Sequence, residues 1–220
     1  MALASCSHCG KQTEVEVRQS INTALDPELK DRVRDGSLFV WECPYCGHRN
    51  LARYQTLYHD PDAKLMVWLL PGEKTPPKAV EEAVKELEGY TLRRVREVGD
   101  LIEKVNIRDA NLEDTVLEMC KWVTRRELGA KNPEAAEAPL RFLRLEGADN
   151  DLVLALPLNG QMQVLNVGFN VYEDARGILQ AWEDGKGSGV VTYNGRMIEN
   201  LHVESAQRTL SIAEAIAALG

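Results

Sequence analysis

Four cysteines near the start of the chain form two pairs, and two residues separate the cysteines of each pair. The first cysteine motif is Cys6–Gly10 and the second is Cys43–Gly47, and both end in glycine. This spacing lets the two sulfurs of a pair turn toward one point, and the glycine permits the positive-φ backbone of a tight turn. Four thiolates complete a tetrahedral zinc shell without leaving a position for water. The motifs therefore predict one structural zinc ion, with the ligands Cys6, Cys9, Cys43 and Cys46.

Two other uses of these cysteines remain open. A C-x-x-C pair can be a thiol-redox centre, and oxidised cysteines can form disulfides. The first residues include neither a basic stretch nor the long apolar run of a secretory signal, so we expect a cytoplasmic protein whose thiols stay reduced and available to a metal. Thirty-three residues separate Cys9 from Cys43, against about 15–20 in a compact zinc ribbon, so the segment between them must fold by itself.

Three further residues have side chains that bind metals or react as thiols. His8 and His48 lie within and beside the cysteine motifs, and either could replace a sulfur as a ligand. Because four cysteines already fill the shell, we interpret both histidines as turn residues that could donate hydrogen bonds to the thiolates. Cys120 lies inside a helical pattern, where a small core residue is the favoured interpretation.

The composition is that of a folded, soluble protein, with 44% hydrophobic and 27% charged residues in 220. This length accommodates one large or two modest domains. The longest apolar run, 65–71, is far shorter than the ~20 residues of a membrane span. The net charge is −8, and the basic residues Arg93, Arg94 and Arg96 have acidic neighbours. Nucleic-acid-binding domains usually carry a clustered basic patch, so nucleic acid is a disfavoured partner.

The segment between the cysteine motifs is predicted to be strand–helix–strand. Alternating apolar and polar residues predict strands over 13–21 and 37–42. Asp26 is a suitable N-cap and Pro27 suits the first helical position, so a short helix is expected to follow them and to stop at Gly36. Zinc would tie the two ends of this insert together, which matters because so small a piece has a small core.

Two strands, over 50–57 and 64–70, are expected after the second cysteine motif. The second of them is predicted to be buried on both faces because its residues are almost all apolar. Residues 57–61 read as a turn between the strands, since Asp-Pro commonly opens one. His59 and Asp60 lie in this turn and are not interpreted as a catalytic pair.

The whole chain is predicted to be α+β, with a zinc-ribbon-like module followed by mixed helices and antiparallel hairpins. The expected divisions are a zinc-ribbon-like module (1–72), a helical part of the same domain (73–129), a linker or frayed helix (130–139) and a C-terminal α+β region (140–220). Periodicity predicts helices over 78–88, 99–106, 112–128, 171–183 and 206–219, and strands over 90–97, 140–146, 151–156, 162–169 and 190–199, the last as a hairpin. Asn111 is the expected N-cap of the helix at 112–128, and Glu103, Asp114 and Glu118 are expected on solvent-facing sides.

Residues 1 to about 130 resemble the CpXC domain family, a prokaryotic family named for two Cys-Pro-x-Cys motifs. Besides the cysteines, the matching stretches are Pro44 in the second motif, the helix start 26–30 and the residues 57–60. Ser7 stands where the family has proline, and the sulfurs are unaffected by that difference. The resemblance implies a zinc-ribbon-like start and implies no activity.

No catalytic or cofactor-binding residues can be assembled from contiguous motifs. The glycine-rich stretch 185–189 contains a lysine, but Gln180 stands where a phosphate-binding loop needs its first glycine, and a strand rather than a helix is expected to follow. The favoured function is a non-catalytic, zinc-stabilised scaffold that binds a protein or a small ligand. The alternatives are a transcription-associated zinc ribbon that binds nucleic acid and a thiol-redox protein or enzyme. The nucleic-acid alternative would use residues near the second motif: Tyr45, Arg49, Arg53 and Tyr54.

Overall fold

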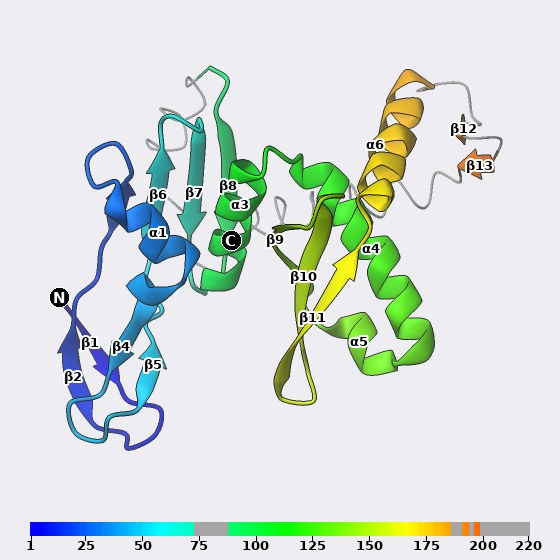
Figure 1. Cartoon of the computed structure of the whole chain (residues 1–220). Helices are drawn as coiled ribbons and strands as arrows, with labels where there is room; N and C mark the ends of the chain where they lie inside the picture. Colours follow the sequence, from blue (N-terminus) through cyan, green and yellow to red (C-terminus); the bar gives the residue numbers. More distant parts are fainter. Residues whose placement is uncertain (73–87, 186–190, 194–195, 199–220) are drawn as a thin grey trace. The chain divides into compact units, whose positions relative to one another are not determined.

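The computed structural model describes residues 1–72, 88–185, 191–193 and 196–198 (Figure 1). The chain divides into two compact units, the first running from Met1 to Val105 and the second beginning at Asn106. The division falls within helix α3 (Val98–Asp109). Both units mix strands with helices, which confirms the predicted α+β fold class.

The first unit begins with two small hairpins that are separated by the predicted insert. Each hairpin is a two-stranded antiparallel sheet, β1 with β2 and β4 with β5, and each turn between paired strands contains one cysteine motif (Figure 1). The insert between the hairpins holds a short strand, a helix and a 3-10 turn. The elements are β1 (Ala2–Ser5), β2 (Gln12–Val15), β3 (Ser20–Asn22), α1 (Glu28–Arg34), the 3-10 turn (Ser37–Phe39), β4 (Val40–Glu42) and β5 (Arg49–Leu51).

A four-stranded sheet follows in the order β3-β6-β7-β8. The chain enters it through β3, so the insert between the cysteine motifs is part of this larger sheet. β6 and β7 form an antiparallel pair, and β3 and β8 lie parallel to their neighbours. The remaining strands are β6 (Thr56–Asp60), β7 (Leu65–Leu69) and β8 (Thr91–Val95). Helices α1 and α3 contribute to the buried core, which consists of Ile21, Leu29, Val33, Phe39, Tyr58, Leu65, Val67, Leu69, Val95, Val98, Leu101 and Val105.

Three local predictions for the first unit are wrong. The expected turn at 57–61 is largely strand β6, because pairing with β3 and β7 buries alternate residues of this stretch. The strand at 64–70 is fully buried on one face only, since Met66 and Trp68 remain half-buried on the other. The strand expected over 37–42 begins with a 3-10 turn that follows the left-handed Gly36.

The start of helix α1 also differs from its prediction. Pro27, rather than Asp26, occupies the N-cap, and no side-chain hydrogen bond caps the helix. The buried Leu29 and Val33 anchor α1 to the core instead, which is how most short helices in proteins are stabilised. The helix predicted over 78–88 lies, except for its last residue, outside the described residues.

The second unit packs helices on one face of a three-stranded antiparallel sheet with the order β11-β10-β9. Asn159 and Gly160 both have positive φ in the tight turn between β10 and β11, which confirms the predicted hairpin. The elements are α4 (Asp114–Lys131), α5 (Pro133–Glu137), β9 (Arg141–Glu146), β10 (Asp151–Leu158), β11 (Gln161–Val167), α6 (Phe169–Asp184), β12 (Val191–Tyr193) and β13 (Arg196–Ile198). The core consists of Ile107, Leu112, Val116, Leu117, Met119, Cys120, Ala135, Leu140, Phe142, Leu152, Leu154, Leu156, Tyr172 and Ala175.

Residues 130–139, which were expected to be a linker or a frayed helix, are largely helical. They contain the end of α4 and the short helix α5, whose Ala135 is buried. Asn132 caps α5 by accepting a hydrogen bond from the amide of Glu134 at 3.1 Å. Gly129 permits the two helices to approach closely, because a Cβ at that position would lie 2.7 Å from the Cβ of Ala136.

Helix boundaries and burial differ from expectation at three further positions. Asn111 does not cap α4; it adopts a left-handed conformation (φ +54°) beyond the end of α3, and α4 starts at Asp114. The prediction that Glu103 and Glu118 face solvent is wrong. Glu103 is 3% exposed, and Glu118 forms an ion pair at 2.8 Å with the buried Lys121. The helix predicted over 206–219 and residues 186–189 of the glycine-rich stretch lie outside the described residues.

None of the helices in the part of the chain that the structure describes combines the length and the apolar character needed to cross a membrane.

Asp60 at the end of β6 makes a buried ion pair with a testable pH dependence. Its carboxylate accepts hydrogen bonds from Lys30 Nζ at 2.8 Å, the amide of Ala63 at 3.1 Å and the Tyr58 hydroxyl at 3.3 Å. Burial raises the pKa of Asp60, but these bonds and the charge of Lys30 outweigh burial and lower it below its ordinary value. The carboxylate therefore contributes stability that is present above the unfolded-state pKa of about 3.9 and is lost as the pH falls through the lower folded-state pKa.

Asp60→Asn is accordingly expected to lower the free energy of unfolding by about 2 kcal/mol at pH 7, since it weakens a charge-assisted hydrogen bond. Urea denaturation measures this difference. The gap between parent and variant should shrink below about pH 4, where the parent carboxylate also becomes protonated. Asp62→Asn, at an exposed neighbouring position, is the control. A gap that is independent of pH would contradict the assigned role of the carboxylate charge.

Candidate metal centre

The two cysteine motifs fold in the same way at the turns of their hairpins. In the first motif, the amide of Cys6 donates to the carbonyl of Lys11 at 2.9 Å, and the amide of Gly10 donates to the carbonyl of Cys6 at 3.0 Å. The equivalent pairs in the second motif are Cys43 with His48 and Gly47 with Cys43, both at 2.9 Å. The shared backbone pattern directs both cysteines of each motif toward a common point between the hairpins.

Glycine is required at the end of each motif by the backbone conformation. Gly10 has φ +71° and Gly47 has φ +70°, in the left-handed region that residues with a Cβ rarely adopt. Each of these glycines closes the turn one residue after the second cysteine of its motif. The positive φ angles confirm the prediction that a tight turn requires glycine at both positions.

The four sulfurs form one compact cluster, as the motif spacing predicts. Cys6 Sγ lies 3.7 Å from Cys46 Sγ, and Cys9 Sγ lies 3.7 Å from Cys43 Sγ. All four sulfurs lie within 4.8 Å of one another. A zinc–sulfur bond of about 2.3 Å implies sulfur–sulfur edges of about 3.8 Å in a regular tetrahedron, whereas a disulfide bond is about 2.05 Å long. The cluster could therefore hold one metal ion, and all four cysteines are free thiols.

Each motif contributes one buried and one exposed cysteine. Cys6 and Cys43, the first residues of the two motifs, are 3% and 1% exposed, whereas Cys9 and Cys46 lie on the surface. The cluster thus lies at the edge of the first unit, with its inner half enclosed by the hairpins. Because Cys9 and Cys46 are exposed, an ion from solvent can reach the four sulfurs on their side of the cluster.

Asn50 in β5 connects the two motifs, and sequence reasoning missed it. Its Oδ1 accepts hydrogen bonds from the amide and the hydroxyl of Ser7, both at 2.9 Å. Its Nδ2 donates to the carbonyl of His48 at 2.9 Å and approaches Cys6 Sγ at 3.5 Å. The side chain is almost fully buried, at 8% exposure. One amide group therefore holds the first motif against the second and also contacts a sulfur of the cluster.

The pKa values of Cys6 and Cys46 are shifted in opposite directions by their surroundings. Burial raises the pKa of Cys6, but bonds from the amides of Cys9 and His8, from the Asn50 side chain and from the Cys46 thiol outweigh it and lower the pKa to about 6. At Cys46 the amide of His48 lowers the pKa, whereas burial and the neighbouring thiols raise it to about 12. A bound dication would stabilise the thiolate forms of the four cysteines.

The two histidines of the motifs lie beside the cluster and are not part of it. The rings of His8 and His48 stack on each other with centroids 5.2 Å apart. The cluster of possible metal ligands among the described residues contains the four cysteines alone. The backbone amide of His8 donates to Cys6 Sγ at 3.4 Å, which is the kind of supporting hydrogen bond expected for this residue.

The other residues that sequence analysis considered have separate environments. His59 Nε2 lies 3.1 Å from the Tyr90 hydroxyl, whereas the adjacent Asp60 is paired with Lys30. Cys120 is buried in the core of the second unit, as expected, and burial raises the pKa of its thiol to about 12. Near the second motif, Tyr45 is 57% exposed and has the Lys11 ammonium 4.7 Å from its ring centre.

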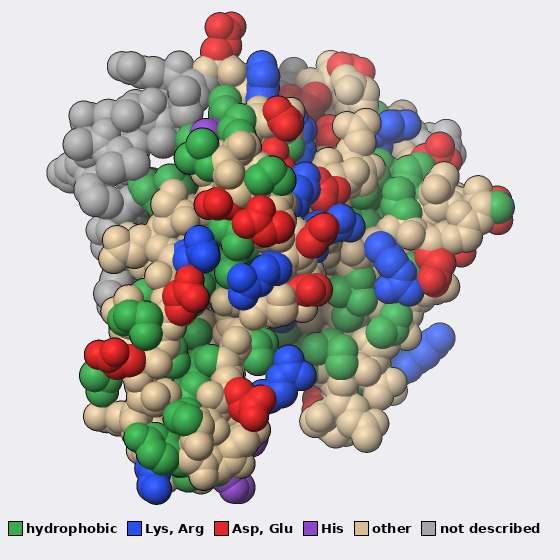
Figure 2. Space-filling view, turned by 60° about the vertical axis from the view of Figure 1, so that its left-hand side comes forward, with side chains coloured by type: hydrophobic (Ala, Val, Ile, Leu, Met, Phe, Trp, Pro, Cys, Tyr) green, Lys and Arg blue, Asp and Glu red, His purple; other side chains and the backbone are tan. Residues whose placement is uncertain are grey.

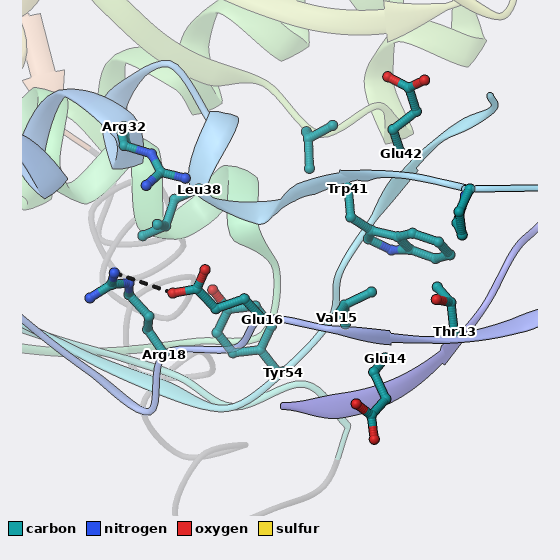
Figure 3. Close-up of a pocket in the computed structure, with 12 residues that line it drawn as sticks. Thr13, Glu14, Val15, Glu16, Arg18, Arg32, Leu38, Trp41, Glu42 and Tyr54 are labelled. Carbon is teal, nitrogen blue, oxygen red and sulfur yellow. Dashed lines mark ion pairs between the residues drawn. The ribbon is translucent and has the colours of Figure 1, made fainter.

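A cleft of about 360 Å³ lies beside the hairpins within the first unit. Figure 3 shows Arg18 and Arg32 at the same end of the cleft as Tyr54, whereas the indole of Trp41 lies near Thr13 at the other. Arg18 forms an ion pair with Glu16 at 3.2 Å. The complete lining is Thr13, Glu14, Val15, Glu16, Arg18, Arg32, Leu38, Val40, Trp41, Glu42, Pro44 and Tyr54. The cleft therefore combines aromatic and aliphatic surfaces with both signs of charge.

Two hairpins whose turns bring four cysteines into one cluster define a ribbon-like module with the donor set of a metal site. The chain belongs to the CpXC protein family, whose family model matches residues 4–121, more than half of the chain. This match confirms the resemblance drawn from the cysteine motifs. Comparisons with curated proteins and with solved structures found no match.

Proposed function

We propose that this protein is a non-catalytic interaction or ligand-binding scaffold whose first unit is stabilised by one structural zinc ion. The ligands would be the thiolates of Cys6, Cys9, Cys43 and Cys46. The observation that carries the proposal is the agreement between the 3.7 Å sulfur–sulfur separations and the edges of a zinc–thiolate tetrahedron, about 3.8 Å. Four sulfurs leave no open position for water or substrate, which favours a structural over a catalytic ion.

The small size of the hairpins explains why an ion would be needed. β4 and β5 have three residues each and β1 and β2 have four, and an isolated two-stranded hairpin is marginally stable at best. Most residues of these strands are at least partly exposed, so they contribute little to a core. The free energy of zinc binding would be available as folding free energy and would hold the two hairpins together.

The arrangement of the sulfurs favours metal binding over thiol-redox chemistry. The two 3.7 Å separations join a cysteine of one motif to a cysteine of the other. A redox C-x-x-C centre instead exchanges electrons between the two cysteines of one motif. Because four sulfurs from two motifs surround one point, a shared ion accounts for the cluster more directly than two independent redox pairs do.

The cleft beside the hairpins supports the binding part of the proposal. Its volume falls within the range of small-molecule sites, about 300–1,000 Å³, and its Trp41 and Tyr54 offer flat apolar contacts. The basic side chains on the face in Figure 2 lie among acidic ones, and the chain carries a net charge of −8. Both features favour a protein or small-molecule partner over a nucleic acid.

Native mass spectrometry tests the zinc assignment. The full chain, purified without added metal, is expected to carry one zinc ion and to lose it to a strong chelator, with unfolding of the first unit. Cys120→Ala, which changes a cysteine outside the cluster, should retain the ion and serves as the control. A metal-free chain with the mass deficit of disulfide-bonded cysteines would overturn the proposal in favour of redox chemistry. Zinc without structural loss on chelation would overturn its structural role.

A further inference from the structure

The basic groups of the cleft beside the hairpins gather at one of its ends. Arg18 lies between strands β2 and β3, and Arg32 lies in helix α1, so two separate elements bring their guanidinium groups to this end (Figure 3). Arg18 is paired with Glu16 at 3.2 Å, whereas Arg32 forms no ion pair with any described residue. Burial raises the pKa of the Tyr54 hydroxyl, while the charges of both arginines act on the same hydroxyl in the opposite direction. The two guanidinium groups therefore act together at this end of the cleft.

Three glutamates also line the cleft, but only one directs its carboxylate toward the basic end. Figure 3 shows the carboxylates of Glu14 and Glu42 pointing away from the side chains of Val15 and Trp41. Adjacent side chains of a strand point to opposite faces, which explains why these two carboxylates turn away where their neighbours turn inward. The remaining carboxylate, that of Glu16, balances one of the two guanidinium groups. One positive charge at this end is therefore left for a ligand to balance.

The rest of the cleft offers flat and aliphatic surfaces that the core holds in place. The indole of Trp41 lies near Thr13 at the end opposite the arginines (Figure 3). The ring centroid of Tyr54 lies 5.7 Å from that of the fully buried Phe39, and both Tyr54 and Leu38 pack against the core of the first unit. Aromatic rings held in this way are preformed contacts for a planar apolar group.

We infer that the cleft binds a small aromatic carboxylate, with its ring against Trp41 and its carboxylate between Arg18 and Arg32. The planar guanidinium group matches the two oxygens of a carboxylate and forms paired, charge-assisted hydrogen bonds with them. Arg32 supplies the guanidinium group that lacks an internal partner, and Arg18 adds a second positive charge. The inference rests on the proposed ligand-binding function and adds the chemical class of the ligand.

Charge and size both distinguish this ligand from other anions. One unbalanced positive charge matches a monoanion, whereas a dianionic phosphate would leave negative charge without a partner beside Glu16. The cleft volume of about 360 Å³ lies near the lower end of the range for small-molecule sites, about 300–1,000 Å³. A compact molecule with one ring system and one acidic group therefore fits the cleft better than a polymer does.

Isothermal titration calorimetry of the full chain tests the inference with three acids of different shape: benzoate, 3-phenylpropanoate and 2-naphthoate. At least one of them is expected to bind with a Kd below about 1 mM. The neutral amide of that acid and phenyl phosphate are each expected to bind at least about tenfold more weakly.

Two substitutions assign the binding to the cleft. Arg32→Gln and Arg18→Gln should each weaken binding of the acid by about tenfold or more, because each removes a charge-assisted hydrogen bond. Arg34→Gln is the matched control, since Arg34 lies in the same helix, has a 48% exposed side chain and does not line the cleft. It should bind the acid as the parent does. Circular dichroism melting of each variant shows whether the fold is retained.

Three results would overturn the inference. They are no binding of any of the three acids at about 5 mM, equal binding of the amide or of phenyl phosphate, and unchanged binding by both Arg18→Gln and Arg32→Gln. The zinc content is measured on the same samples. A chain that keeps one zinc ion but binds no acid would leave the proposed metal site standing, whereas a chain without zinc would contradict that site whatever the cleft binds. The two proposals are therefore tested separately.

Discussion

Cys46→Ser is expected to abolish stoichiometric zinc binding and to destabilise the first unit strongly. Serine removes one of four thiolates, and the remaining three leave a position open to water. At a fixed concentration of free zinc, each thousandfold loss of affinity removes about 4 kcal/mol of binding-linked stability. The unfolding free energy of the first unit should therefore fall by about 4 kcal/mol or more.

Cys46 is the informative position because it lies on the surface. Exchanging sulfur for oxygen there leaves no cavity in the core, so the loss of stability reports on the ion and not on packing. The same exchange at Cys43, which is 1% exposed, would mix both effects. Trp41 and Trp68 in the first unit provide a fluorescence signal for its unfolding in urea.

The matched control is Cys120→Ala in the core of the second unit. This variant creates a small cavity and should lose stability while keeping one zinc ion. Zinc content is measured with a colorimetric chelator after denaturation. A Cys46→Ser protein with a full equivalent of zinc and the unfolding curve of the parent would contradict the metal assignment.

The cysteine cluster could be predicted from sequence because its geometry is local to each motif. Two residues between cysteines and a glycine after them determine a turn, and the chain then needs only to bring two such turns together. The hairpin at Asn159–Gly160 was predictable for the same reason, since both residues tolerate positive φ. These features depend on a few neighbouring residues and not on the rest of the fold.

Features that depend on distant partners could not be predicted. Residues 57–61 contain an Asp-Pro turn signal, yet pairing with β3 and β7 makes residues 57–60 part of strand β6. The helical pattern places Glu118 on the surface, whereas in the structure it forms an ion pair with the buried Lys121. Asn50 belongs to no sequence motif. It connects the two cysteine motifs through hydrogen bonds with Ser7, which lies 43 positions earlier in the chain. In each case tertiary contact overrides the local pattern.

Asn50→Ala is expected to weaken zinc binding by about 10- to 100-fold while leaving the four ligands in place. The substitution removes both hydrogen bonds from Ser7, the bond to the carbonyl of His48 and the contact with Cys6 Sγ. The ion alone would then hold the two motifs together. Part of the free energy of zinc binding would therefore offset the entropy lost when the motifs become ordered. At saturating zinc the variant should still bind one ion, which distinguishes it from Cys46→Ser.

Asn50→Asp separates the two functions of the side chain. Aspartate keeps the acceptor for Ser7 but replaces the donor to Cys6 with a negative charge beside the thiolates. Like charges oppose deprotonation and metal loading, so the loss of affinity should exceed that of the alanine variant. Competition with a chromogenic chelator measures all three proteins, and Arg49→Ala, at an exposed neighbour in β5, is the control. If Asn50→Asp binds zinc as tightly as the parent, Asn50 stabilises the fold of the hairpins without acting on the sulfurs.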